Sequence, residues 1–116
     1  MNDSIIYIFI ALIIFIAYKK YKQRKVLKIV PTLLSQGAQV IDVRSEVEFA
    51  FGHKDGSINI PLNSLKGRMN ELDKTKPIIL CCASGSRSAI AKYTLASGGF
   101  ENIHNAGAWH SLSKVK

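Results

Sequence analysis

The chain opens with an unbroken apolar stretch. From Ile5 to Tyr18 every residue is aliphatic, aromatic or alanine, so the helix that this run predicts has no polar face. These 14 residues span about 21 Å as a helix, short of the roughly 30 Å hydrocarbon core of a bilayer. Adding residues 1–4 and 19–21 extends the helix to about 31 Å. We therefore expect a transmembrane helix over residues 1–21.

The remaining chain alternates between short β-branched runs and segments with helical spacing. Strands are expected at residues 39–43, 57–60, 77–81 and 101–105, and helices at residues 31–36, 46–51, 64–72 and 86–97. This alternation predicts an α/β domain over residues 31–116, with a mainly parallel sheet flanked by helices. Pro31 is expected to interrupt the helix before it, which leaves residues 22–30 as a basic juxtamembrane linker.

Basic residues cluster directly after the apolar stretch. The 116-residue chain has a formal net charge of +8, and six of its 16 Lys and Arg residues lie between positions 19 and 28. Without these six, ten basic residues face eight acidic ones, a net charge of +2. The rest of the chain therefore offers no basic face for nucleic acid. A basic cluster on the C-terminal side of a span places the following chain in the cytoplasm, and it is suited to contact anionic lipid headgroups.

Two other interpretations of the apolar stretch fit the sequence less well. A cleaved signal peptide carries basic residues ahead of its apolar region, whereas here Asp3 comes first and Lys19 and Lys20 follow. A buried core helix would not be apolar on every side and then stop at a cationic cluster. We therefore expect a single-pass protein of the cell membrane with a cytoplasmic domain. A chain that starts near Val30 is expected to be soluble and active.

The cysteine content excludes some kinds of site. The two cysteines are adjacent at positions 81 and 82, which excludes a disulfide scaffold and a four-ligand zinc site. Unpaired cysteines agree with a reducing compartment. His104 and His110 lack metal-ligand spacing with either cysteine, so we predict no metal site. Trp109 is expected to pack on the domain.

The segment after the third expected strand concentrates the candidate chemistry. Cys82 ends a buried strand, and a loop and a helix follow: Ala83, Ser84, Gly85, Ser86, Arg87. Open α/β sheets bind ligands at this edge. Small residues let successive backbone N–H groups converge on one point, while the helix N-terminus and Arg87 add positive charge. Such a cradle lowers the pKa of a thiol and can bind an anionic substrate and stabilise developing charge.

This loop resembles the active-site loop of single-domain rhodanese-like sulfurtransferases, in which a six-residue loop runs from a cysteine to an arginine. Two further blocks resemble the two ends of that family's sequence: residues 40–44, 48–49, 52–53 and 59–62, and residues 95–100 with 105–109. The resemblance covers roughly residues 31–113, nearly all of the chain beyond the apolar stretch. It implies a rhodanese-like fold for the domain.

The resemblance also implies a persulfide mechanism. Cys82 would take a sulfane sulfur from a small anionic donor such as thiosulfate and pass it to a thiophilic or protein acceptor. Substrate would be bound by the loop residues Ala83, Ser84, Gly85, Ser86 and Arg87. No metal or organic cofactor is required. The chain departs from the family at Ala83, where a basic residue is common.

Two alternative functions stay open. Counted from Cys81, five residues precede Arg87, which is the spacing of cysteine-dependent phosphatases and arsenate reductases. The uncharged Ala83 is also compatible with a membrane-tethered sulfur carrier or binding module that turns over small donors poorly. Strand alternation places Cys81 on the opposite side from Cys82, so we predict that Cys81 is buried and inert.

Four other polar residues could be taken for a catalytic set. They are Asp42, Arg44, Glu48 and His53. Charged groups at a strand end and on the next helix commonly pair with each other and fix a loop. A thiolate held in a nest of N–H groups needs no general base. We therefore predict structural roles for all four.

Overall fold

The domain is built on a four-stranded parallel sheet. The computed structural model describes residues 2–116 of the chain. In spatial order the strands are β2 (Ile58–Asn59), β1 (Gln39–Asp42), β3 (Ile78–Cys82) and β4 (Ile103–Ala108). Every neighbouring pair is parallel, and the pairing of β3 with β4 shifts register between Leu80 and Cys82. The α/β architecture with a parallel sheet is thus confirmed.

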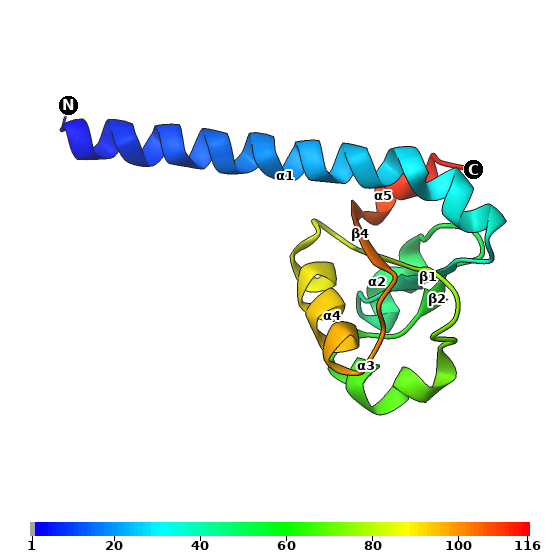
Figure 1. Cartoon of the computed structure of the whole chain (residues 1–116). Helices are drawn as coiled ribbons and strands as arrows, with labels where there is room; N and C mark the ends of the chain where they lie inside the picture. The colour runs from blue at the N-terminus through cyan, green and yellow to red at the C-terminus, as the bar shows by residue number, and fades with distance from the viewer. Residues whose placement is uncertain (1) are drawn as a thin grey trace.

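Helices cover both faces of this sheet (Figure 1). They are α1 (Asp3–Ser35), α2 (Glu46–Phe51), α3 (Leu62–Leu65), the 3₁₀-helix η1 (Lys66–Glu71), α4 (Ser86–Ser97) and α5 (Trp109–Ser113). The bounds of α2 and α4 agree with the segments predicted from the sequence. Ser45 begins α2 with a capping box in which its side chain and that of Glu48 satisfy each other's backbone N–H groups.

Side chains alternate along β3 between two separate hydrophobic cores. Ile78, Leu80 and Cys82 belong to the core that α3 and α4 cover, with Leu65 and Leu95 among its members. The other two strand residues belong to the second core, which lies under α1 and α5 and includes Val30, Leu33, Ala106 and Leu112. Two-sided burial explains why this strand is apolar without interruption.

Helix α1 differs from the prediction at Pro31. The helix continues through Pro31 to Ser35 without interruption, although proline cannot donate to the carbonyl one turn earlier. Val30 and Leu33 are buried against the sheet on either side of the proline, and this packing holds the last turns helical. Figure 1 shows the helix bending toward the domain at this end, as proline-containing helices do.

The stretch predicted as a linker, residues 22–30, is therefore helical and partly packed on the domain. Val26 and Leu27 lie against the second core, and Gln23 donates a hydrogen bond from Nε2 to the carbonyl of Ala106 at 3.0 Å. The first half of α1 projects beyond the domain (Figure 1), and the apolar side chains of residues 5–18 are exposed there. The packed unit thus begins near Gln23, ahead of residue 31.

Two other elements differ from the sequence prediction. The helix expected at 64–72 is a short α-helix followed by the 3₁₀-helix η1, in keeping with the weak helix propensity of Gly67 within it. Its apolar stripe is nevertheless real, because Leu65 and Leu72 are buried. The last strand ends at Ala108 and not at residue 105, and α5 follows it directly.

Candidate active site

The loop after β3 wraps around the sulfur of Cys82. Gly85 has a φ of 102°, a left-handed conformation that favours glycine, and it turns the chain into α4. The Gly85 N–H donates to Cys82 Sγ at 2.9 Å, and the Ser88 N–H, from the first turn of α4, donates to it at 3.4 Å. The loop covers Cys82 completely. The sequence-predicted nest of N–H groups is therefore present in the structure.

These contacts set the protonation of Cys82. Burial alone would raise the pKa of its thiol, because a thiolate loses solvation inside the protein. Hydrogen bonds from Ser88, through its side chain and its N–H, and from the N–H groups of Gly85 and Ser84 outweigh that effect. The net result is a pKa below the ordinary value for cysteine. The site thus stabilises a thiolate, the form of cysteine that acts as a nucleophile.

The Ser88 hydroxyl, from α4, and the Asn105 amide, from the neighbouring strand β4, support the loop. Ser88 Oγ lies 3.4 Å from Cys82 Sγ and 2.6 Å from Asn105 Oδ1. Asn105, on β4, also donates from Nδ2 to the carbonyl of Gly85 at 3.3 Å and accepts from the N–H of Gly107 at 2.9 Å. The amide therefore connects β4 to both the loop and the first turn of α4.

Arg87 is held by an ion pair at the edge of the loop. Its Nη1 and Nη2 atoms donate to the two carboxylate oxygens of Glu48 at 2.6 and 2.9 Å. This pairing, led by the hydrogen bond from Arg87, lowers the pKa of Glu48 to about 2. Ala83, Ser84 and Ser86 are exposed, so the loop is open to solvent on its outer side. The predicted charge of Arg87 is present beside the loop, but a carboxylate already neutralises it.

Cys81 lies on the other face of the sheet, as strand alternation predicts. Its side chain is completely buried in the core under α1 and α5. Burial raises the pKa of the Cys81 thiol well above its ordinary value, and the nearby Asp42 carboxylate adds to the rise. A seven-residue phosphatase loop would need Cys81 as its nucleophile. The orientation and pKa of this thiol argue against that register.

Charged residues after β1 form a structural network. Arg44 pairs with Asp42 at 2.7 Å, and the side chains of both are buried. The guanidinium also donates to the carbonyls of Glu48 and Gly52, and it lies 4.5 Å from the centre of the Trp109 ring. The predicted pairing of Asp42 with Arg44 is confirmed, as is the packing of Trp109. Glu48, in contrast, pairs with Arg87 and so ties α2 to the active loop.

The histidines lie outside the sulfur site. His53 stacks on Phe49 with 3.7 Å between ring centres, and its Nδ1 lies 2.8 Å from the Phe49 carbonyl. His104 contacts Asn102 through Nε2 at 2.6 Å. His110 is exposed on α5. Within residues 2–116, no group of three or more His, Cys, Asp or Glu residues could hold a metal ion.

Two residues of the site, Ser88 and Asn105, are not among those predicted from the sequence. Ser88 belongs to α4, but its side chain is completely buried beside Cys82. Asn105 lies on β4 next to β3, and parallel strands bring their carboxyl ends to the same edge of a sheet. That placement was a signal available in the sequence, because Asn105 is the last residue of the strand expected at residues 101–105 and so lies at its carboxyl end.

Comparison with known proteins agrees with this geometry. The family model described as a rhodanese-like domain matches residues 27–111. The uncharacterized protein YqhL of Bacillus subtilis (strain 168) is 41% identical over 108 residues, which cover 90% of this chain and 86% of that protein. Thiosulfate sulfurtransferase GlpE of Ectopseudomonas mendocina (strain ymp) is 36% identical over 73 residues, 63% of this chain and 67% of that protein. The structure described as rhodanese with anions from E. coli superposes with a TM-score of 0.60 at 33% identity, covering 63% of this chain and 88% of that one.

Proposed function

The chain belongs to the rhodanese-like domain family, and we propose that it is a sulfurtransferase that carries a sulfane sulfur on Cys82. The observation that carries this proposal is the set of hydrogen-bond donors around one sulfur atom. The N–H groups of Gly85 and Ser88 donate to Cys82 Sγ, the Ser88 hydroxyl lies 3.4 Å from it, and hydrogen bonding lowers the pKa of this thiol. The same donors suit the terminal sulfur of a persulfide, which is also an anion. A thiosulfate sulfurtransferase among the similar proteins supports the reaction class.

The proposed reaction has two displacement steps. The Cys82 thiolate attacks the outer sulfur of thiosulfate, a new S–S bond forms, and sulfite leaves with the electron pair of the old bond. A nucleophilic acceptor then attacks the outer sulfur of the persulfide and releases the Cys82 thiolate. No net electron transfer to a third component occurs. The loop residues Ala83 and Ser84 face solvent on the outer side of the loop that covers Cys82.

A thiosulfate:cyanide assay on the full chain tests this proposal. We expect turnover that Cys82→Ser reduces by at least about a thousandfold, because the nucleophile is removed. Cys81→Ser is the matched control, since it changes the neighbouring thiol on the opposite face, and it should keep most of the activity. Intact-mass measurement after thiosulfate treatment should show one added sulfur atom only when Cys82 is present. Loss of the adduct in Cys81→Ser alone would contradict the assignment of Cys82 as the nucleophile.

Parallel measurement with p-nitrophenyl phosphate separates the phosphatase alternative. A sulfurtransferase using Cys82 should leave this substrate unchanged. A sulfur carrier with little turnover is the second candidate, and one observation favours it: Arg87 is paired with Glu48 and Ala83 has no charge, so the loop offers little free positive charge to a small dianion. A carrier would accept the sulfur adduct but show little cyanide-dependent turnover.

We further propose that the first half of α1 anchors the protein in the cell membrane with its domain in the cytoplasm. Helix α1 is long and apolar enough to cross a bilayer by length and composition. Large apolar side chains such as Tyr7, Ile8 and Ile13 are 65–69% exposed along its free half. Exposed apolar surface of this extent supports contact with lipid. The basic cluster that follows supports the cytoplasmic orientation.

Fractionation and labelling test the anchor. The full chain should stay in the membrane pellet through a high-salt wash, which removes proteins held only by surface charge. Intact mass should show an uncleaved N-terminus, which distinguishes an anchor from a signal peptide. Labelling of Cys82 by membrane-impermeant thiol reagents in intact cells would contradict the orientation.

A further inference from the structure

A cavity of about 670 Å³ lies between the middle of α1, helix α4 and the loop after β3. Ser84 and Gly85 are part of its lining, so the cavity opens on the loop that surrounds Cys82. None of the described residues that line it is acidic. Five of them are lysines, and we call the cavity the lysine groove after these residues: Lys19, Lys20, Lys22, Lys25 and Lys92.

Helix α1 is connected to the active loop through β4, because the Gln23 side chain packs on Gly107 and Gly107 packs on Gly85 of the loop. A Cβ atom on Gly107 would lie 2.8 Å from Nε2 of Gln23, and a Cβ atom on Gly85 would lie 3.2 Å from the Cα of Gly107. Gln23 of α1, Gly107 of β4 and Gly85 of the loop are thus stacked with no side chain between the two glycines. Figure 1 shows α1 passing across the tip of this loop. The helix is therefore a wall of the cavity beside the active loop as well as a candidate anchor.

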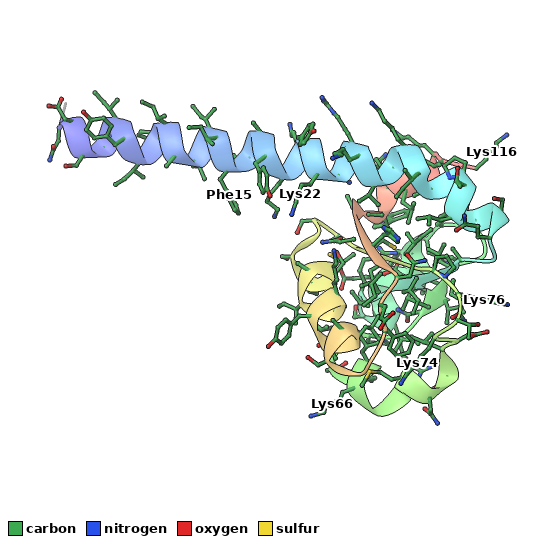
Figure 2. All side chains as sticks on the ribbon, in the orientation of Figure 1. Phe15, Lys22, Lys66, Lys74, Lys76 and Lys116 are labelled. Carbon is green, nitrogen blue, oxygen red and sulfur yellow. The ribbon has the colours of Figure 1, made fainter. Side chains whose placement is uncertain are left out.

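Among residues 2–116, the groove lysines of α1 have no acidic partner within ion-pair distance. Lys19 lies one helical turn before Gln23, and Lys22 one turn before Val26, so both share the domain-facing side of α1. Figure 2 shows Lys22 on that side. Lys19 lies over the Phe15 ring and Lys22 over the Tyr18 ring, at 5.6 and 5.1 Å from the ring centres. None of the ion pairs formed within residues 2–116 includes a groove lysine.

Charge and size together indicate the ligand. The active loop lacks free positive charge, because Ala83 is neutral and Arg87 is paired with Glu48. Unpaired positive charge next to the loop is supplied instead by the lysine groove. Its volume lies within the range of about 300–1,000 Å³ that is usual for small-molecule sites and greatly exceeds the needs of thiosulfate. Such a site suits a molecule with several negative charges and a body of considerable size.

We propose that the lysine groove binds the polyanionic body of a small thiol persulfide and presents its outer sulfur to Cys82. This inference rests on the sulfur transfer proposed above. The Cys82 thiolate attacks the outer sulfur of R–S–SH, the Cys82 S–S bond forms, and the old S–S bond breaks. The thiolate R–S⁻ leaves with the electron pair, and the proton stays on the transferred sulfur. Atoms and electrons balance without a further reactant.

The experiment uses the full chain in a non-ionic detergent, which supplies no anionic headgroup. The probe is coenzyme A, a small thiol with several phosphate charges, and its persulfide. The test variant is K19Q/K22Q. The matched control is R24Q/K28Q, which removes two positive charges from the same stretch of α1 at exposed residues outside the groove lining. Binding of coenzyme A is measured by calorimetry in a Cys82→Ser background, where no sulfur transfer takes place.

We expect K19Q/K22Q to weaken coenzyme A binding by about tenfold or more, and R24Q/K28Q by less than about twofold. Added salt should weaken binding to the unsubstituted groove. In the active protein, kcat/KM for coenzyme A persulfide should fall in the same pattern. With thiosulfate, which is too small to occupy the groove, kcat/KM should fall by less than about threefold.

Three outcomes would overturn the inference. They are equal binding of coenzyme A by both double variants, no binding to either the variants or the parent protein, and an equal loss of kcat/KM for thiosulfate and for the persulfide. If the groove lysines bind lipid headgroups instead, both double variants should bind coenzyme A equally. Because the calorimetry does not depend on Cys82 chemistry, a protein that binds coenzyme A but transfers no sulfur would contradict the proposed function and leave the groove assignment standing.

Discussion

Cys81 and Cys82 are neighbours in β3, yet the two faces of the sheet give their thiols opposite properties. Both side chains are completely buried, so exposure does not distinguish them. Cys81 lies among apolar side chains under a helix and near the Asp42 carboxylate, and its pKa is raised. Cys82 lies under a loop whose N–H groups point at its sulfur, and its pKa is lowered. What covers each thiol decides its reactivity.

The two consecutive residues lie on opposite faces of the parallel sheet, where one thiol packs in a core and the other can take part in a reaction. On the face of Cys81, the second core joins α1 and α5 to the sheet and holds the domain together. On the face of Cys82, the chain leaves the strand and turns into α4, so that N–H groups of the loop and of the first turn of α4 point at the sulfur and can stabilise an anion there. A shift of one residue in β3 would exchange these two environments.

The contrast should be largest in thiol alkylation. With iodoacetamide at pH 7.5, the single thiol of Cys81→Ser should react at least about a hundredfold faster than the single thiol of Cys82→Ser. The thiolate is the reacting form, and a loop opens more readily than a packed helix. Rates measured by intact mass, with the denatured proteins as a control for intrinsic reactivity, check this. Equal rates would show that the faces do not differ as described.

Removing the part of α1 that packs on the core around Cys81 should have the next largest effect, on the stability of the domain. The sequence alone suggests that a chain starting near Val30 keeps its fold, but the structure changes this expectation, because Val26 and Leu27 pack on the second core. Loss of these side chains should lower the free energy of unfolding by about 2–4 kcal/mol and expose Cys81 to alkylation. A chain starting at Lys19 retains both residues and is the control. Thermal unfolding of the two truncated chains, with alkylation of Cys81, provides the measurement.

Much of this arrangement could be predicted from the sequence, and the misses have physical causes. Strand β3 and helices α2 and α4 were predictable because the continuous apolar run, the glycines and the Ser45 cap are local signals. The end of α1 was not, because a rule about Pro31 in isolated helices cannot include the tertiary packing of Val30 and Leu33. Tertiary contacts override local propensity here.

The same division holds for the candidate site. Cys82 and its loop were predictable, since a nest of N–H groups is encoded by consecutive small residues. The pairing of Arg87 with Glu48 was not, because the two residues are 39 positions apart and each had other possible partners. The contribution of α1 to the groove beside the loop depends on how the helix packs after Gln23, which no local pattern shows.

Removing one hydrogen-bond donor beside Cys82 should change the reactivity of this thiol by a smaller amount. Ser88→Ala removes the hydroxyl beside Sγ and leaves the backbone N–H in place. Because the hydrogen bond from the Ser88 side chain favours the thiolate, the pKa of Cys82 should rise. Alkylation should therefore slow by up to about tenfold on the acidic side of the profile and converge with the parent rate at high pH. Ser86→Ala is the control, since Ser86 is an exposed residue of the same turn. An unchanged pH profile of alkylation in Ser88→Ala would show that the hydroxyl does not influence the pKa of Cys82.

The smallest effect should come from adding charge at the rim of the loop without changing either face of the sheet. Ala83 is exposed next to Cys82, and Ala83→Arg places a guanidinium where a small dianion approaches. The KM for thiosulfate should fall by about two- to fivefold, an effect typical of a solvent-screened charge. The acid limb of the pH profile should stay in place, because the pKa of Cys82 is set by burial and by donors from Ser88, Gly85 and Ser84.

Tyr93→Arg, which adds the same charge at a 77% exposed position of α4, is the control and should leave KM unchanged. A shift of the acid limb in Ala83→Arg would mean that rim charge, and not the cover of the thiol, controls Cys82. An unchanged KM would mean that the donor does not pass this rim, which would direct attention to the side of the loop that faces α1.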